Sequence, residues 1–286
     1  MVNTLSPAER LISSTVRIEC ARRGRGVSTG TGFLCSLLQK DGYYAPVLVT
    51  CRHVVAGAQR GRLHLHLATP RGQPVAAKYH TLTLDDFQSR WLPHPETRVD
   101  LCVMPIAELL LELQQRATLA FELLEAALIP TAAELMELSA CEDVVVVGYP
   151  NGVWDSVNNR PIVRKGITAT EPRVEYMGRA EFLVDIAWLP GASGSPVFLW
   201  NIGSYATRAD ELRGGSRVKL LGILSGSPAY RMTSAVELMN ESLEQQATAS
   251  PAILDNFGVV VKARKLLEFE PILEAMAVRG HQRWAW

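Results

Sequence analysis

The order of hydrophobic and polar positions predicts short β-strands along most of the chain. Residues 14–20 and 62–67 alternate with a period of two, as a strand with one buried face does. Other short apolar segments lie between turns rich in Gly and Asp. The predicted strands cover residues 14–20, 30–35, 47–50, 62–67, 144–147, 162–169, 180–187, 197–200, 218–225 and 257–262. Because few helical crossovers separate them, we expect antiparallel β architecture.

Helical spacing is confined to three segments. Ser6 followed by Pro7 predicts a short N-terminal helix. Leucines recur at helical spacing within residues 107–139, which we interpret as a helical connection that covers the core between two β halves. Residues 263–278 are predicted to form an amphipathic C-terminal helix. The polar segments 203–215 and 227–250 are predicted to be surface loops, and the tryptophans of the tail, Trp284 and Trp286, to pack against the C-terminal helix.

Composition indicates an ordinary globular protein. The 286 residues are 48% hydrophobic and 20% charged, and the 29 basic and 29 acidic side chains cancel. This balance argues against a dedicated nucleic-acid binder, which would carry a basic excess. We interpret the one basic cluster, Arg22, Arg23 and Arg25, as a solvated loop rather than a phosphate site.

The sequence also predicts a compartment. It has no run of the roughly 18 apolar residues that a membrane span needs, and its N-terminus does not resemble a secretory signal. The five cysteines are an odd number without CxxC spacing, which favours reduced thiols over a disulfide or zinc framework. We therefore expect a cytoplasmic protein without a metal, a membrane partner or a nucleic-acid partner.

The segment PGASGSP at residues 190–196 is the strongest candidate for chemistry. Ser193 lies among small residues in a tight turn between apolar strands, where a substrate carbonyl can approach its hydroxyl. Glycines at 191 and 194 allow backbone conformations that other residues resist. The N–H groups of Gly191 and Ser193 are then predicted to form an oxyanion hole. Taken alone, the segment is equally compatible with a glycine-rich and serine-rich hairpin that has no catalytic role.

A serine nucleophile needs a base, and the base needs an orienting acid. His53 lies at the end of an apolar strand in TCRHVV, and Asp100 begins another in VDLCVMPI. An isolated aspartate there is also compatible with a simple turn. His64 and His66 alternate along one strand and are interpreted as surface residues rather than half of a metal site.

Together, the three segments around His53, Asp100 and Ser193 resemble the triad blocks of trypsin-like serine peptidases of the bacterial type, in the His, Asp, Ser order of that family. The resemblance extends to GTGF at residues 30–33, VGYP at 147–150 and GILSG at 222–226. It implies a mainly β fold of two packed six-stranded antiparallel barrels, with a helical insertion and a C-terminal helix. Residues 1–139 and 140–286 would be the two halves of one peptidase domain.

The resemblance also implies roles for individual residues. Ser193 would be the nucleophile, His53 the general base and then acid, and Asp100 the orienting carboxylate, with no cofactor. Ala187 and Pro190 would line the primary specificity site, where Ala187 offers no charge and a small or apolar substrate side chain is expected. Ser225 and Gly226 would bind an extended peptide by strand addition. Asp185 is a candidate buried structural acid beside that site.

These roles predict a serine endopeptidase that acts on peptides or proteins. Ala192 stands where secreted relatives have an aspartate that pairs with a trimmed N-terminus, so activation by trimming is not supported. Two alternatives remain open. One is a latent protease activated by a partner protein, as in bacterial stress or defence systems, and the other is an inactive peptide-binding scaffold.

Overall fold

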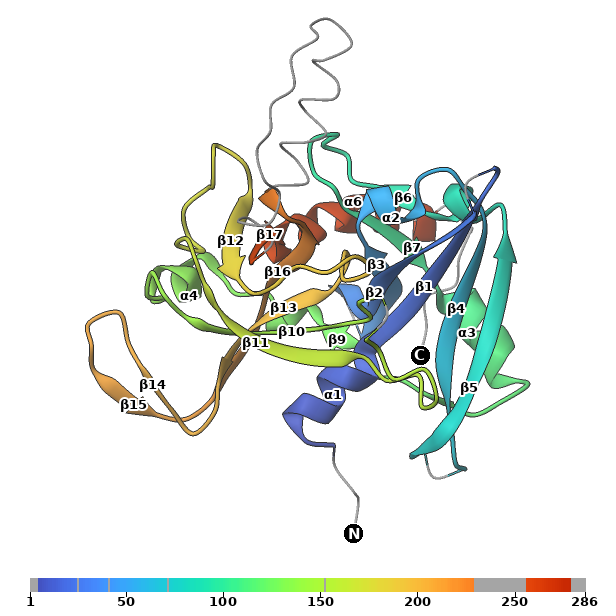
Figure 1. Ribbon diagram of the computed structural model, residues 1–286, viewed down its shortest axis with the longest axis horizontal. Coiled ribbons are helices and arrows are strands. Elements are labelled where there is room, and N and C mark those ends of the chain that lie inside the picture. The colour runs from blue at the N-terminus through green and yellow to red at the C-terminus, as the bar shows by residue number, and fades with distance from the viewer. Residues whose placement is uncertain are drawn as a thin grey trace, which may run out of the picture.

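The computed structural model describes residues 5–24, 26–40, 42–70, 72–151, 153–228 and 256–278. Arg25 of the basic cluster, most of the predicted loop at 227–250 and the tryptophans of the tail lie outside these residues. Figure 1 shows two β halves packed side by side, with α1 at one end and the C-terminal helix α6 behind the strands.

Strands dominate both halves, and the helices are short (Figure 1). The helical elements are α1 (Pro7–Ser14), α2 (Arg52–Val55), α3 (Ala107–Gln114), α4 (Ala132–Met136) and α6 (Glu270–Val278), with 3₁₀ turns η1 (Phe87–Arg90), η2 (Ala126–Leu128) and η4 (Ala263–Phe269). The strands of the first half are β1 (Thr15–Arg22), β2 (Gly26–Lys40), β3 (Tyr43–Thr50), β4 (Ala58–Ala68), β5 (Pro74–Asp85), β6 (Leu92–Pro93), β7 (Cys102–Pro105), β8 (Leu119–Ala120) and β9 (Leu124–Glu125). Those of the second half are β10 (Asp143–Gly148), β11 (Ile162–Thr168), β12 (Glu181–Asp185), β13 (Pro196–Asn201), β14 (Ser204–Ala206), β15 (Leu212–Gly214), β16 (Arg217–Gly226) and β17 (Phe257–Lys262).

The two halves differ in how their strands pair. The first half is a nine-stranded sheet with the order β5-β4-β1-β2-β3-β7-β6, to which β8 and β9 add at β4 and β2. The second half is a closed barrel of six strands, β10-β11-β12-β17-β16-β13. The prediction of a mainly β, two-part fold with a C-terminal helix is therefore confirmed, and the first half contains more strands than the six expected.

Local sequence explains where the helices begin. Ser6 accepts a hydrogen bond from the Glu9 N–H, and the Glu9 carboxylate accepts one from the Ser6 N–H, which forms a capping box with Pro7 in the first turn. Thr131 and Glu134 form the same arrangement at α4. The predicted helix start at Ser6 is thus confirmed.

The predicted helical connection is only partly helical. α3 and α4 lie within residues 107–139, but the chain between them forms β8 and β9, which join the first sheet. The leucine spacing persists because these strands bury Leu124 and half-bury Leu119 against the same core. Residues 203–215, predicted as an irregular loop, contain the β14–β15 hairpin.

One hydrophobic core joins the halves. Phe33 and Leu48 of the first sheet belong to the same cluster of buried side chains as Val147 and Phe198 of the barrel. The C-terminal segment returns to the first half, where Phe269 and Leu273 are buried in that cluster and Glu270 accepts a hydrogen bond from the Leu38 N–H at 3.0 Å. Among the described residues, none of the helices has the length and apolarity needed to cross a bilayer.

Candidate active site

The pairing of two strands brings His53 and Asp100 together. β3 and β7 are antiparallel neighbours, with Thr50 opposite Cys102, so the end of β3 and the start of β7 lie at the same edge of the sheet. His53 follows β3 on the short helix α2, and Asp100 lies just before β7. The Arg52 N–H donates to the Asp100 carbonyl at 3.4 Å, which connects the two segments.

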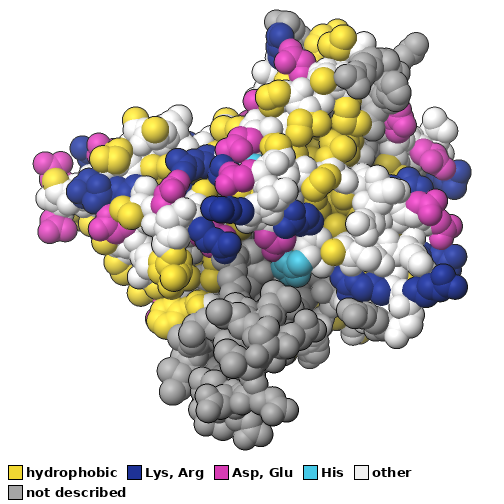
Figure 2. All heavy atoms as spheres, turned by 90° about the horizontal axis from the view of Figure 1, so that it is seen from above, with side chains coloured by type: hydrophobic (Ala, Val, Ile, Leu, Met, Phe, Trp, Pro, Cys, Tyr) yellow, Lys and Arg dark blue, Asp and Glu magenta, His cyan; other side chains and the backbone are white. Residues whose placement is uncertain are grey.

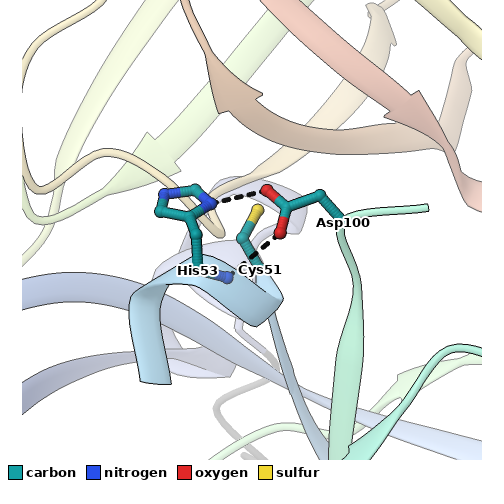
Figure 3. Close-up of side chains that lie close together, drawn as sticks. All are labelled: Cys51, His53 and Asp100. Carbon is teal, nitrogen blue, oxygen red and sulfur yellow. Dashed lines mark hydrogen bonds and ion pairs between the residues drawn. The ribbon is translucent and has the colours of Figure 1, made fainter. Parts of the chain in front are cut away.

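The Asp100 carboxylate contacts His53 at two points (Figure 3). Its Oδ2 lies 2.5 Å from His53 Nδ1, and its Oδ1 accepts a hydrogen bond from the His53 N–H at 3.0 Å. A proton on Nδ1 makes this contact a donor–acceptor pair, which leaves Nε2 as a proton acceptor. The His53 side chain is 43% exposed and the Asp100 side chain 22%, so substrate can reach the imidazole while the carboxylate is partly shielded.

Arg22 supports the helix that carries His53. Its guanidinium donates to the carbonyls of His53 at 3.2 Å, Val54 at 2.8 Å and Ala56 at 2.7 Å. Such carbonyls at the end of a helix lack partners within the helix. The interpretation of the basic cluster as a solvated loop is therefore wrong for Arg22, which is the last residue of β1.

Ser193 lies in the turn between β12 and β13, and this turn packs tightly on the first sheet. Gly194 has φ +91°, and a Cβ there would lie 1.9 Å from the Thr31 carbonyl oxygen. Gly191 has φ +87°, and a Cβ there would lie 2.6 Å from Asn151 Oδ1. Both glycines are thus required by backbone conformation and by space.

Thr31 of β2 holds the turn through two hydrogen bonds. Its N–H donates to the Ser193 carbonyl at 2.9 Å and its hydroxyl donates to the Gly191 carbonyl at 3.0 Å. The same hydroxyl accepts a hydrogen bond from the Tyr149 N–H at 2.9 Å. Thr31 is fully buried, so these bonds form without competition from water.

Two peptide groups in the turn are oriented by bonds to their carbonyls. The Pro190 carbonyl accepts from the Asn151 N–H at 2.8 Å, and the Ala192 carbonyl accepts from the Ser195 N–H at 3.0 Å. In a trans peptide the N–H points opposite to the carbonyl. The N–H groups of Gly191 and Ser193 therefore point away from these partners, and neither donates to an acceptor within the described part of the chain.

The hydroxyl of Ser193 is directed at β16. It donates to the Ser225 carbonyl at 3.4 Å, and among the described residues no hydrogen bond joins it to His53. The residue as a whole is only 6% exposed.

The four candidate substrate-binding residues lie on both sides of the turn. Ala187 and Pro190 are exposed, whereas Ser225 and Gly226 are buried at the end of β16. The ladder between β13 and β16 ends at Ile223, and the Leu224 N–H still donates to the Ser195 carbonyl at 2.9 Å. Asp185, considered a candidate buried acid, is exposed.

Two groups of side chains in the described residues have the composition of a metal site. In the first, Cys51, His53 and Asp100, the 2.5 Å contact between imidazole and carboxylate leaves no room for an ion between them. In the second, His94, Glu96 and Glu268, the Lys265 ammonium already contacts both carboxylates, at 2.7 Å and 2.9 Å. Both groups are thus better explained by hydrogen bonds and ion pairs.

The predicted exposure of His64 and His66 is wrong. Both are buried, at 8% and 5% exposure, because the segment between β10 and β11 covers their strand. Asn159 of that segment donates to the His64 carbonyl at 3.2 Å. Sequence reasoning also missed the supporting roles of Thr31, Asn151 and Arg22.

Positive and negative side chains are mixed on one face of the molecule. On the face shown in Figure 2, Lys and Arg side chains are interspersed with Asp and Glu, among hydrophobic patches. This mixture matches the zero net charge of the sequence and indicates no uniformly basic surface on the described part of that face.

Comparison with known proteins gives one family and several similar structures. The model of the trypsin-like peptidase domain family matches residues 30–204, which include His53, Asp100 and Ser193. No curated protein is significantly similar in sequence. Similar solved structures include the HtrA-type protease AlgW with tripeptide (15% identity, TM-score 0.46, 96% of this chain and 62% of that chain) and a serine endoprotease from Yersinia pestis (14%, 0.46, 95% and 65%). A mutant of Tobacco Etch Virus protease is also similar (11%, 0.49, 100% and 86%). The chain thus spans less than two thirds of the length of the first two.

Proposed function

Because the chain belongs to the trypsin-like peptidase domain family, we propose that it is a serine endopeptidase that cleaves peptide bonds through an acyl-enzyme on Ser193. The observation that carries the proposal is the two-point contact between the Asp100 carboxylate and His53, at 2.5 Å and 3.0 Å. This contact orients the imidazole and stabilises its cation, as a base that activates a serine requires.

In the proposed reaction, the Ser193 hydroxyl turns from the Ser225 carbonyl toward His53. Its oxygen attacks the scissile carbonyl carbon while its proton passes to His53 Nε2. The imidazolium then gives that proton to the leaving amine, and the carbonyl carbon remains attached to Ser193 as an ester. Water attacks the ester with His53 again as base, which releases the acid product and restores the serine.

The negative charge that forms on the carbonyl oxygen needs donors. We assign this role to the N–H groups of Gly191 and Ser193, which are left without acceptors in the described residues. The loss of one such donor costs about 3 kcal/mol of transition-state stabilisation. Because the Asn151 N–H holds the Pro190 carbonyl at 2.8 Å, the proposed hole is oriented before substrate binds.

The end of β16 offers an edge for substrate. The Ser193 hydroxyl donates to the Ser225 carbonyl at 3.4 Å, so the backbone at this end of the strand lies beside the nucleophile. We propose that an extended peptide or protein segment adds to this edge as a further strand. Ala187 and Pro190, in the segment that leads into the turn, would then face the side chain next to the cleaved bond.

A second candidate is a latent form of the same enzyme. The Ser193 hydroxyl donates to Ser225 rather than to His53, which is the arrangement expected of a nucleophile that a partner protein must reorient. We also propose a reducing compartment, the cytoplasm, because none of the five cysteines forms a disulfide and burial raises the pKa of Cys20 and Cys35 to about 12. Such thiols are inert toward oxidation.

The test is the intact mass of the purified protein after reaction with a fluorophosphonate probe. One adduct on the wild type and none on Ser193→Ala is the expected result. Ser195→Ala is the matched control, because the Ser195 hydroxyl is buried without a hydrogen-bond partner among the described residues, and this variant should label like the wild type. A folded wild type without an adduct would contradict the constitutive peptidase. Labelling that appears only with an added partner would favour the latent form. No labelling under any of these conditions would favour the inactive peptide-binding scaffold.

A further inference from the structure

Strand β11 exposes apolar side chains and turns a charged side chain inward, which is the reverse of an ordinary barrel strand. Val163 and Ile167 are 44% and 39% exposed, and the Lys165 side chain between them is 60% exposed. Arg164 lies on the opposite face and is half-buried, opposite Val146 of β10. A strand that exposes its apolar residues and turns a cation inward violates the usual pattern, and such violations concentrate at functional sites.

Among the described residues, the inward cation has no acidic partner. The Arg164 Nη1 donates to the Ala187 carbonyl, and no carboxylate of the described residues forms an ion pair with its guanidinium. Burial lowers the pKa of Arg164 from its ordinary value, yet a guanidinium remains charged at neutral pH. A guanidinium has five N–H donors in a planar fork that matches a carboxylate. Within the described residues, one carbonyl therefore leaves most of the hydrogen-bonding capacity of Arg164 unused.

The place of this cation matters for the reaction. Ala187 lies between the end of β12 and the turn that carries Ser193. The same segment contributes the Pro190 carbonyl held by Asn151 and the Leu189 carbonyl that accepts the Ala192 N–H at 3.0 Å. In the proposed complex, the side chain on the acyl side of the cleaved bond lies along this segment. The Arg164 guanidinium, which donates to the Ala187 carbonyl of this segment, then lies next to that substrate side chain.

We infer that Arg164 selects substrates in which the residue on the acyl side of the cleaved bond is acidic, Glu or Asp. The inference rests on the proposed peptidase function and replaces the expectation of a small or apolar side chain, which considered only Ala187. A substrate carboxylate supplies the missing partner of the guanidinium. A neutral side chain leaves the half-buried charge unpaired, and a basic one is repelled.

A structural role for Arg164 predicts a different result. If the guanidinium only holds the Ala187 carbonyl in place, its removal would disturb the turn and lower the activity on every substrate alike. Selection by charge instead changes the ratio between substrates that differ in charge. The ratio of kcat/KM for Glu and Gln substrates therefore separates the two roles.

The experiment measures kcat/KM for peptides that differ only at this residue, with Glu, Asp, Gln and Leu in turn. The wild type should prefer Glu over Gln by about 100-fold, as expected for a partly buried charge pair. Arg164→Gln should bring that ratio to within a few-fold of one, and Arg164→Lys should retain a preference for Glu. The matched control is Lys165→Gln, on the outer face of the same strand, where Lys165 pairs with Asp143 at 2.8 Å. It should leave the ratio unchanged.

Fluorophosphonate labelling of Ser193 separates failure of this inference from failure of the peptidase proposal. A labelled wild type that cleaves Gln or Leu substrates as well as Glu substrates would overturn the acidic preference and leave the peptidase intact. An equal loss on all substrates in a labelled Arg164→Gln would overturn it in favour of the structural role. A folded wild type that neither labels nor cleaves would overturn both. If Arg164→Gln does not fold, binding of peptides ending in Glu or Gln to Ser193→Ala decides, and equal affinity would contradict the inference.

Discussion

The N–H of Thr31, in the first sheet, donates to the carbonyl of Ser193, in the turn of the barrel, at 2.9 Å. The proposed nucleophile, Ser193, and the proposed base, His53, belong to different halves of the chain, so their relative position depends on contacts of this kind. The Thr50 hydroxyl donates in turn to the Thr31 carbonyl at 2.7 Å. Thr50 is the last residue of β3, just before the helix that carries His53, and Thr31 thus connects both parts of the site.

Replacement of Thr31 by Val should impair catalysis more than folding. It removes the donor to the Gly191 carbonyl and leaves the buried Tyr149 N–H without its acceptor. We expect kcat to fall by about 10- to 100-fold and the free energy of unfolding by about 1–3 kcal/mol. Steady-state kinetics and urea denaturation measure the two effects. Thr31→Ser keeps the hydroxyl and should restore kcat, and wild-type kcat in Thr31→Val would contradict this role.

Gly194 should tolerate no side chain. In Gly194→Ala the Cβ would meet the Thr31 carbonyl oxygen at 1.9 Å and Thr50 Oγ1 at 2.4 Å, at a φ of +91°. We expect a loss of about 3 kcal/mol or more in the free energy of unfolding, together with loss of labelling at Ser193. Gly203→Ala is the matched control, because Gly203 has φ +86° with open space around it. It should cost only about 1 kcal/mol, and equal costs for both variants would refute the steric argument.

Sequence alone predicts the parts of the site that depend on local pattern. The two glycines around Ser193 indicate a tight turn, and His53 and Asp100 lie at the ends of apolar strands that the structure pairs through Thr50 and Cys102. The strand positions and the helix start at Ser6 follow from the same local rules.

What sequence reasoning missed depends on contacts between distant segments. Thr31 and Gly191 are 160 residues apart, and no periodicity relates them. His64 and His66 alternate as residues on a solvated face do, but the segment that contains Asn159 covers that face. Arg164 lies in a predicted strand, and only the pairing of that strand in the barrel turns its side chain inward. Alternation identifies two faces of a strand, whereas tertiary packing decides which face is buried.

Arg22 should affect catalysis through the helix of His53. Arg22→Ala removes the donors to the carbonyls of His53, Val54 and Ala56. We expect kcat to fall by about 10-fold, with a loss of about 1–2 kcal/mol in the free energy of unfolding, because these carbonyls lose charge-assisted bonds. Kinetics of Arg22→Ala and of its exposed neighbour Arg23→Ala provide the comparison. Similar kcat values in the two variants would show that α2 holds His53 without Arg22.

His66 makes the stability of the fold depend on pH. Burial, with a smaller contribution from the nearby Arg160 charge, lowers the pKa of His66 to about 4. Its Nε2 is buried without a hydrogen-bond partner in the described residues. The unfolded chain therefore takes up a proton at this histidine near pH 6.5, whereas the folded chain takes it up only near pH 4.

The contribution of His66 to the free energy of unfolding should thus be fully present above about pH 6.5. It should be lost progressively as the pH decreases from 6.5 toward 4. From pH 7 to pH 5 the contribution of His66 is a loss of about 2 kcal/mol, since one pKa unit corresponds to about 1.4 kcal/mol. Urea denaturation at the two pH values measures it, and His66→Phe should remove this part of the pH dependence. His80→Gln, on the neighbouring strand β5, leaves His66 intact and should keep the full dependence. An unchanged pH dependence in His66→Phe would show that His66 contributes none of it, and the cause would then lie in other titrating groups.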